Sequence, residues 1–65
     1  MYTKLFHIGE RVMRSLELLK YSANKHWSGK RGTVIKTGNG YSLVKWDHIE
    51  EPILEDNSYI ELAEM

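Results

Sequence analysis

Apolar and polar residues alternate most clearly between residues 29 and 47. "GTVIKT" (32–37) and "YSLVKWD" (41–47) are rich in β-branched and aromatic residues, which favour strands. The "GNG" between them supplies residues that tolerate a positive φ in a tight turn. The pattern therefore predicts a β-hairpin whose core-facing side chains are Val34, Val44 and Trp46.

The same alternation predicts which side chains point away from that core. It places Tyr41, Leu43 and Lys45 on the outer face of the second strand. On the first strand it places Lys36 on the face of Val34, opposite Ile35. Ile35 and Leu43 then need a second cover, which a barrel that curls on itself or a contact with another copy would provide.

Three shorter strands are predicted, over residues 9–14, 52–55 and 59–64. Val12 is the expected core residue of the first, and Ile60 and Leu62 are the expected core residues of the last. "EDNS" between the last two has turn composition compatible with one 3₁₀ turn. The prediction is a mainly β chain of five short strands.

The segment "SLELLKYSANK" (15–25) has a different pattern. Ser15 is a possible N-cap, and Leu16 and Leu19 have the spacing of one helix face. A helix of one to three turns and an irregular loop closed by Leu18, Leu19 and Tyr21 both fit. Either one makes the first loop long.

Sixty-five residues predict a single domain, 1–65, near the lower size limit for a self-sufficient core. The chain has no cysteine, which excludes disulfides and thiolate metal sites and suits a reducing compartment. No stretch has the roughly 18 apolar residues of a membrane span or the apolar region of a signal peptide. We therefore expect a cytoplasmic protein without a cofactor.

The zero net charge hides a strong segregation of charge along the chain. Residues 1–45 hold all nine Lys and Arg and two acids, a net charge of +7, whereas residues 46–65 hold seven acids and no Lys or Arg. This division is typical of a polyanion-binding face or an acidic interaction segment. The alternative is that the two segments neutralise each other within the fold.

The order "GERV", long loop, "GKRGTVIKTGNGYSLVKWD", short strand, 3₁₀-type turn and terminal "YIELA" resembles SH3-like small barrels of the KOW, Tudor and Mib/Herc2 type. The resemblance spans residues 8–63. It implies a five-stranded SH3-like barrel, a scaffold that binds RNA, DNA, peptides or copies of itself. The matching residues are Gly9, Val12, Gly32, Val34, Val44, Trp46, Asp47 and Leu62.

The chain also resembles the type II dihydrofolate reductases, through "GERV" and "WSGKRGTVI". In that family a "V-Q-I-Y" segment before the 3₁₀ turn lines the active site, and "PILED" here has no glutamine or tyrosine. The similarity implies a shared scaffold only.

A site for single-stranded nucleic acid needs cations for phosphates and flat rings on which bases stack. The same cations would contact duplex phosphates with weak sequence readout. The alternative interpretation makes Trp27 a core ring over the barrel end and the lysines an ordinary solvated surface. The predicted nucleic-acid-binding residues are Lys25, Trp27, Lys30, Arg31, Lys36, Tyr41 and Lys45.

A protein-interaction module is the second functional hypothesis, as a homo-oligomer sealed by Ile35, Leu43 and Ile53 or as an acidic inhibitor of a host protein. Small size and the resemblance suggest a phage or mobile-element accessory protein. The acidic partner-binding residues would be Glu50, Glu51, Glu55 and Asp56, expected as a solvated rim.

Catalysis and metal binding are not predicted. His7, His26 and His48 lack paired i, i+4 spacing and cysteine support, so they do not suggest a zinc site. The chain has no nucleophile elbow and no glycine-rich phosphate loop. We therefore expect a non-enzymatic protein.

Overall fold

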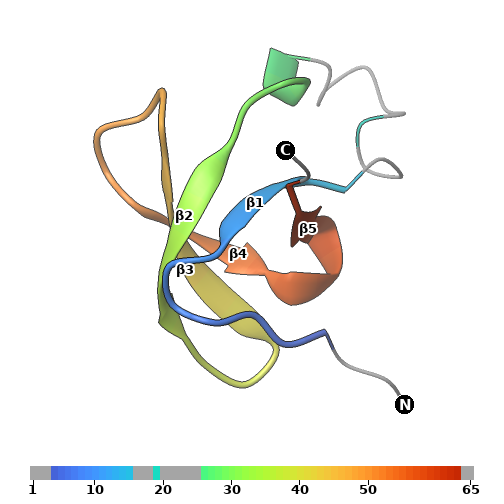
Figure 1. The fold of residues 1–65 in the computed structure, drawn as a ribbon, viewed down its shortest axis with the longest axis vertical. Helices are drawn as coiled ribbons and strands as arrows, with labels where there is room; N and C mark the ends of the chain where they lie inside the picture. Colours follow the sequence, from blue (N-terminus) through green and yellow to red (C-terminus); the bar gives the residue numbers. More distant parts are fainter. Residues whose placement is uncertain (1–3, 16–18, 20–25, 64–65) are drawn as a thin grey trace.

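The structure is a computed structural model that describes residues 4–15, 19 and 26–63. It confirms a mainly β chain with one five-stranded antiparallel sheet (Figure 1). The strands follow the spatial order β4-β3-β2-β1-β5. Their bounds are β1 Arg11–Arg14, β2 Gly32–Thr37, β3 Tyr41–Trp46, β4 Ile53–Asp56 and β5 Ile60–Leu62.

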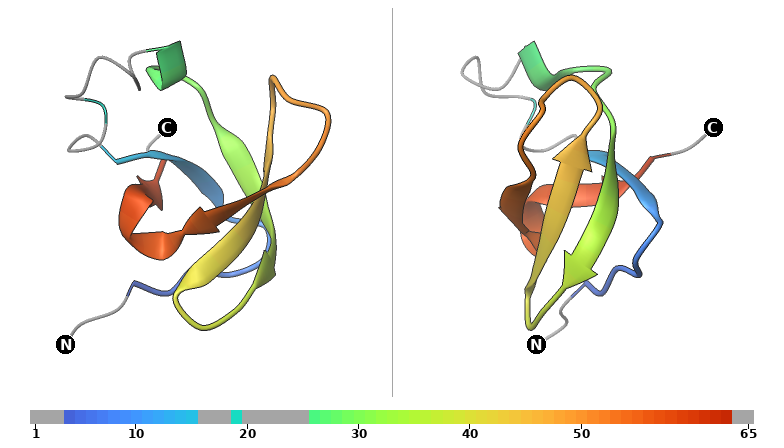
Figure 2. Two further views of the ribbon diagram at one scale, coloured as in Figure 1. Left: turned by 180° about the vertical axis from the view of Figure 1, so that it is seen from behind. Right: turned by 90° about the vertical axis from the view of Figure 1, so that its left-hand side faces the viewer.

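The predicted hairpin is the centre of this sheet. β2 and β3 lie side by side along one flank of the molecule, with their tight turn at one end and the 26–31 loop at the other (Figures 1 and 2). Gly40 in the turn has φ +79°, a conformation that favours glycine. Gly32 permits close approach of the two strands, because a Cβ there would lie 2.6 Å from Val44 Cγ1 and 3.1 Å from Trp46 Cα.

The two edge strands are consecutive in the chain. Only η2, a 3₁₀ turn over Asn57–Tyr59, separates β4 from β5, so the predicted 3₁₀ turn is confirmed. The Asp56 side chain accepts from the backbone N–H of Ser58 and caps this turn. Such a short connection brings the sheet's two edges toward each other, and the sheet is strongly curved but not closed (Figure 2).

The core lies on the concave face of the sheet. Val12, Val34, Val44, Trp46 and Ile60 are completely buried, which confirms their prediction as core residues. Phe6 completes the buried cluster, and Trp27, Ile49 and Ile53 pack against it. Ile53, predicted to seal an oligomer, therefore belongs partly to the core.

A β-bulge overturns part of the predicted alternation. The register shifts between Val34 and Lys36, so Val34 pairs with Val44 but Lys36 pairs with Leu43. Because directly paired residues share a face of the sheet, Lys36 lies on the outer face with Leu43 and not beside Val34. The extra residue, Ile35, is exposed.

The prediction that Leu62 is a core residue is wrong, because Leu62 is 52% exposed even though it pairs with fully buried Val12. It belongs to an edge strand that pairs with β1 alone among the described strands. Ile60, two residues earlier, remains fully buried.

The predicted helix or loop over 15–25 lies mostly outside the described residues. Of that segment, the structure describes Ser15 and Leu19. The backbone N–H of Leu19 donates to the Ser15 carbonyl at 3.1 Å, the spacing of one α-helical turn.

Candidate nucleic-acid interface

Three basic side chains from two parts of the chain border one open hollow of about 410 Å³. Arg11 comes from β1, Lys30 and Arg31 come from the loop before β2, and a single carboxylate, Asp47, comes from the turn after β3. We call this the cationic hollow; its lining residues are Arg11, Gly29, Lys30, Arg31, Asp47 and His48.

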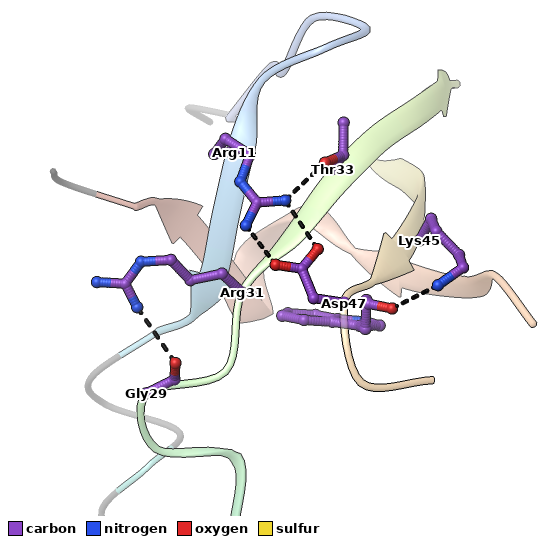
Figure 3. Close-up of polar contacts among 7 residues, drawn as sticks. Arg11, Gly29, Arg31, Thr33, Lys45 and Asp47 are labelled. Atoms are coloured by element: carbon purple, nitrogen blue, oxygen red, sulfur yellow. Dashed lines mark hydrogen bonds and ion pairs between the residues drawn. The ribbon is translucent and has the colours of Figure 1, made fainter. Parts of the chain in front are cut away.

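Arg11 and Asp47, which both line the hollow, form an ion pair with two hydrogen bonds (Figure 3). Arg11 Nη1 donates to Asp47 Oδ1 at 2.9 Å, and Nη2 donates to Oδ2 at 2.5 Å. Nη1 also donates to Thr33 Oγ1 at 2.8 Å, which fixes the plane of the guanidinium. The hydrogen bonds from Arg11 hold the pKa of Asp47 below its ordinary value.

The backbone around the hollow is held by hydrogen bonds within the 26–31 loop and between this loop and the turn after β3. The Asp47 N–H donates to the Arg31 carbonyl at 2.9 Å, and the Lys30 N–H donates to the Trp27 carbonyl at 3.0 Å. Arg31 Nη1 reaches the Gly29 carbonyl at 3.4 Å (Figure 3). Gly29 has φ +80°, so glycine allows this turn without strain. Lys30 itself is exposed.

Trp27 is half-buried and engaged by its own protein. The Arg14 guanidinium lies 4.2 Å from its ring centroid, and the rings of Trp46 and His48 each meet it edge-on at 4.9 Å. Arg14 Nη2 also donates to buried Glu55 at 2.9 Å, and Trp46 Nε1 donates to the same carboxylate oxygen at 3.0 Å. These contacts support the interpretation of Trp27 as a packing residue.

Two other predicted residues lie at the opposite end of the hairpin. Lys36 and Tyr41 are exposed and border a second hollow of about 290 Å³, which also includes Thr37, Leu43 and Leu54. β2 separates them from Arg31, a span of roughly 17 Å at about 3.3 Å per residue. The predicted binding residues therefore form two groups, one at each end of the outer face.

The remaining predicted cations contribute less. Lys45 Nζ donates to the carbonyl of Trp46 at 2.8 Å (Figure 3) and to that of Ile49, so this ammonium stabilises the turn after β3. Lys25 lies outside the described residues.

The expectation of a solvated acidic rim is wrong for Glu55. Its side chain is 4% exposed, because it points from β4 into the core and pairs with Arg14. Burial raises the pKa of Glu55 above its ordinary value, while the charge of Arg14 opposes this shift. Asp56 is exposed but caps η2, and Glu50 and Glu51 are exposed in the β3–β4 loop.

Sequence reasoning missed Arg11, Asp47 and His48 as members of one site. The pairing of Arg11 with Thr33, and of Thr33 with Lys45, brings Arg11 beside the end of β3. Strand register of this kind is a long-range property. The available signal was local: Arg11 alternates with buried Val12 and so points away from the core.

The described residues include no group of three or more side chains suited to hold a metal ion. Within the same residues, no helix has the length and apolar character needed to cross a membrane.

Comparison with protein-family models, curated proteins and solved structures gives no match for this chain.

Proposed function

We propose that this chain is an SH3-like barrel that acts as a non-enzymatic binding module for nucleic acid. The order of its elements supports the resemblance: a long first loop, a central hairpin, a short strand, a 3₁₀ turn and a terminal strand. The curvature of the sheet and the single short turn between its edges are consistent with a small barrel.

The cationic hollow is the observation that carries the functional proposal. Arg11, Lys30 and Arg31 border it with a single carboxylate, so the hollow has a net positive charge. Cations that border one hollow attract phosphate groups, and each neutralised phosphate releases condensed counterions. The segment with a net charge of +7 thus contributes an accessible patch even though Asp47 neutralises part of it.

The outer face of the hairpin explains why a polymer fits better than a small anion. Lys36 lies one strand length from Arg31 and provides a second cationic point. Tyr41 beside it offers an exposed ring, and stacking of a base on such a ring contributes roughly 1–3 kcal/mol. A nucleic-acid strand that lies along β2 would contact phosphate-binding groups at both ends of this β-strand.

Fluorescence anisotropy with labelled single- and double-stranded DNA and RNA at low salt tests this function. We expect binding in the micromolar range that weakens with salt. Lys30→Gln should reduce affinity several-fold, because it removes a phosphate contact. Lys4→Gln removes the same charge outside the hollow, where Lys4 Nζ donates to the Ile60 carbonyl, and should leave affinity nearly unchanged.

The proposal fails if no nucleic acid binds at micromolar concentration. It also fails if Lys4→Gln weakens binding as much as Lys30→Gln does, since binding would then follow net charge alone.

A homo-oligomer is the second candidate, favoured by apolar exposure on the outer face. Ile35, Tyr41 and Leu54 are 42%, 45% and 60% exposed there. Light scattering across a concentration series should show a mass above that of the monomer if copies associate through this face. Leu54→Ser should then restore the monomer, and a monomeric wild-type protein at all concentrations would exclude the oligomer.

A further inference from the structure

We infer that the cationic hollow is a phosphate subsite in which the Asp47 carboxylate occupies the ligand's place. In this view, a phosphate group displaces Asp47 from Arg11 when nucleic acid binds. The inference rests on the proposed function. It adds that Asp47 and the phosphate compete for one group, the Arg11 guanidinium.

The geometry of the pair provides the first argument. Both terminal nitrogens of Arg11 donate to separate oxygens of Asp47, at 2.9 and 2.5 Å (Figure 3). A planar guanidinium binds a carboxylate and a phosphate with the same two-pronged geometry. Because Thr33 also accepts from Arg11 at 2.8 Å, the Arg11 guanidinium is already oriented for the anion that binds to it.

The accessibility of the pair provides the second argument. The Arg11 and Asp47 side chains are 41% and 56% exposed, and they line an open hollow. An exposed ion pair contributes little net stability, so a competing anion can replace it. The neighbouring Arg14–Glu55 pair is buried and lacks this accessibility.

The turn allows the exchange without unfolding. The Asp47 backbone is held by its hydrogen bond to the Arg31 carbonyl, whereas its side chain faces solvent. Rotation of the Asp47 side chain alone would free the Arg11 guanidinium from this ion pair. The incoming phosphate would then lie among the cations that border the hollow.

This arrangement favours polymers over small free anions. A single phosphate that replaces a carboxylate exchanges one anion for another and gains little. A nucleic acid gains the same exchange together with contacts elsewhere on the hairpin, such as exposed Lys36. Competition by Asp47 therefore keeps the affinity for free phosphate low.

Asp47→Asn tests the inference, with Glu50→Gln as a charge-matched control in the same β3–β4 loop, where Glu50 is exposed and does not line the hollow. Asp47→Asn should raise affinity for inorganic phosphate and for a single-stranded DNA oligonucleotide by roughly fivefold, the scale of an exposed ion pair. Glu50→Gln should change both affinities by less than about twofold, because Glu50 does not line the hollow and salt screens an exposed charge outside it. NMR titration with phosphate and anisotropy with the oligonucleotide measure these effects.

Arg11→Lys distinguishes the effect of the two-pronged guanidinium geometry from the effect of the positive charge. It keeps the positive charge but loses the paired N–H groups, so Asp47→Asn should give no gain in that background. An equal gain from Glu50→Gln, or a gain that persists with Lys at position 11, would overturn the inference. Oligonucleotides with and without a 5′-phosphate distinguish a terminal phosphate from backbone phosphates as the occupant.

The two proposals fail differently. If the wild type binds nucleic acid through Lys30 but Asp47→Asn brings no gain, the inference fails and the proposed function stands. If no form of the protein binds nucleic acid while Asp47→Asn gains affinity for inorganic phosphate, the subsite stands and the nucleic-acid function fails. If Asp47→Asn binds neither, both are wrong.

Discussion

The buried pair of Arg14 and Glu55 is the least expected residue-level feature of this small protein. Removing two charges from water is unfavourable, and here it occurs beside a core of few large side chains. Glu55 accepts from both Arg14 and Trp46, but Arg14 Nε is buried without a hydrogen-bond partner in the described part of the chain. The pair is therefore incompletely satisfied.

Removal of one partner should destabilise the protein far more than removal of both. We expect Glu55→Leu alone to lower the free energy of unfolding by about 3 kcal/mol, because it leaves the Arg14 charge buried and unpaired. Arg14→Met with Glu55→Leu should be nearly neutral. Urea denaturation of the three proteins measures this, and a double variant as unstable as the single variant would contradict it.

The raised pKa of Glu55 gives a pH dependence of definite sign. When the pH is above 4.5, the ordinary pKa of a glutamate, the folded state binds more protons at Glu55 than the unfolded state does. Stability contributed by this group therefore falls as pH rises from about 4.5 through the raised folded-state pKa.

Urea denaturation between pH 4 and 8 tests that sign. The wild type should lose stability relative to Arg14→Met/Glu55→Leu as pH increases, because the double variant lacks the group. Curves that stay parallel, or that diverge in the opposite direction, would contradict the assignment.

At the scale of elements, local sequence patterns predicted the strands and the central hairpin but not the register of the pairing. The hairpin over β2 and β3, its glycine turn and the η2 turn follow from composition and alternation. The bulge at Ile35 does not, because the shift from the Val34–Val44 pair to the Lys36–Leu43 pair is a matter of register between two strands, which the alternation along one strand does not contain. Lys36 was predicted as a binding residue, but its accessible position comes from that bulge.

Asn57 connects three elements that are distant in the sequence. Its side chain accepts from Ser42 Oγ at 2.6 Å and donates to the Lys4 carbonyl at 2.8 Å, while its backbone N–H donates to the Gly40 carbonyl. Asn57 is buried, so these side-chain partners would be left unpaired without it. It holds the N-terminal segment against β3 and η2.

Asn57→Ala should therefore lower the free energy of unfolding by about 2 kcal/mol, the effect of unsatisfied buried polar groups. Hydrogen exchange near Phe6 should accelerate first. Asn39→Ala, at an exposed turn position, is the matched control and should change stability little. Equal effects of the two substitutions would exclude the network as a stabilising element.

For the molecule as a whole, the segregation of charge has two outcomes in the structure. Arg11 with Asp47 and Arg14 with Glu55 join the basic and acidic segments, as internal neutralisation predicted. Lys30 and Lys36 remain exposed along the hairpin, as a polyanion-binding face requires. Sequence could identify these cations but not their neighbours, because only strand register decides that Asp47 meets Arg11.

The salt dependence of nucleic-acid affinity is the most direct test of the central claim. The logarithm of the association constant should fall linearly with the logarithm of salt concentration, and Lys30→Gln should reduce the magnitude of the slope by about 0.7–0.9, the value for one lost phosphate contact. Lys4→Gln should leave the slope unchanged. A wild-type affinity that does not depend on salt, or equal slopes for the wild type and Lys30→Gln, would contradict phosphate binding at the cationic hollow.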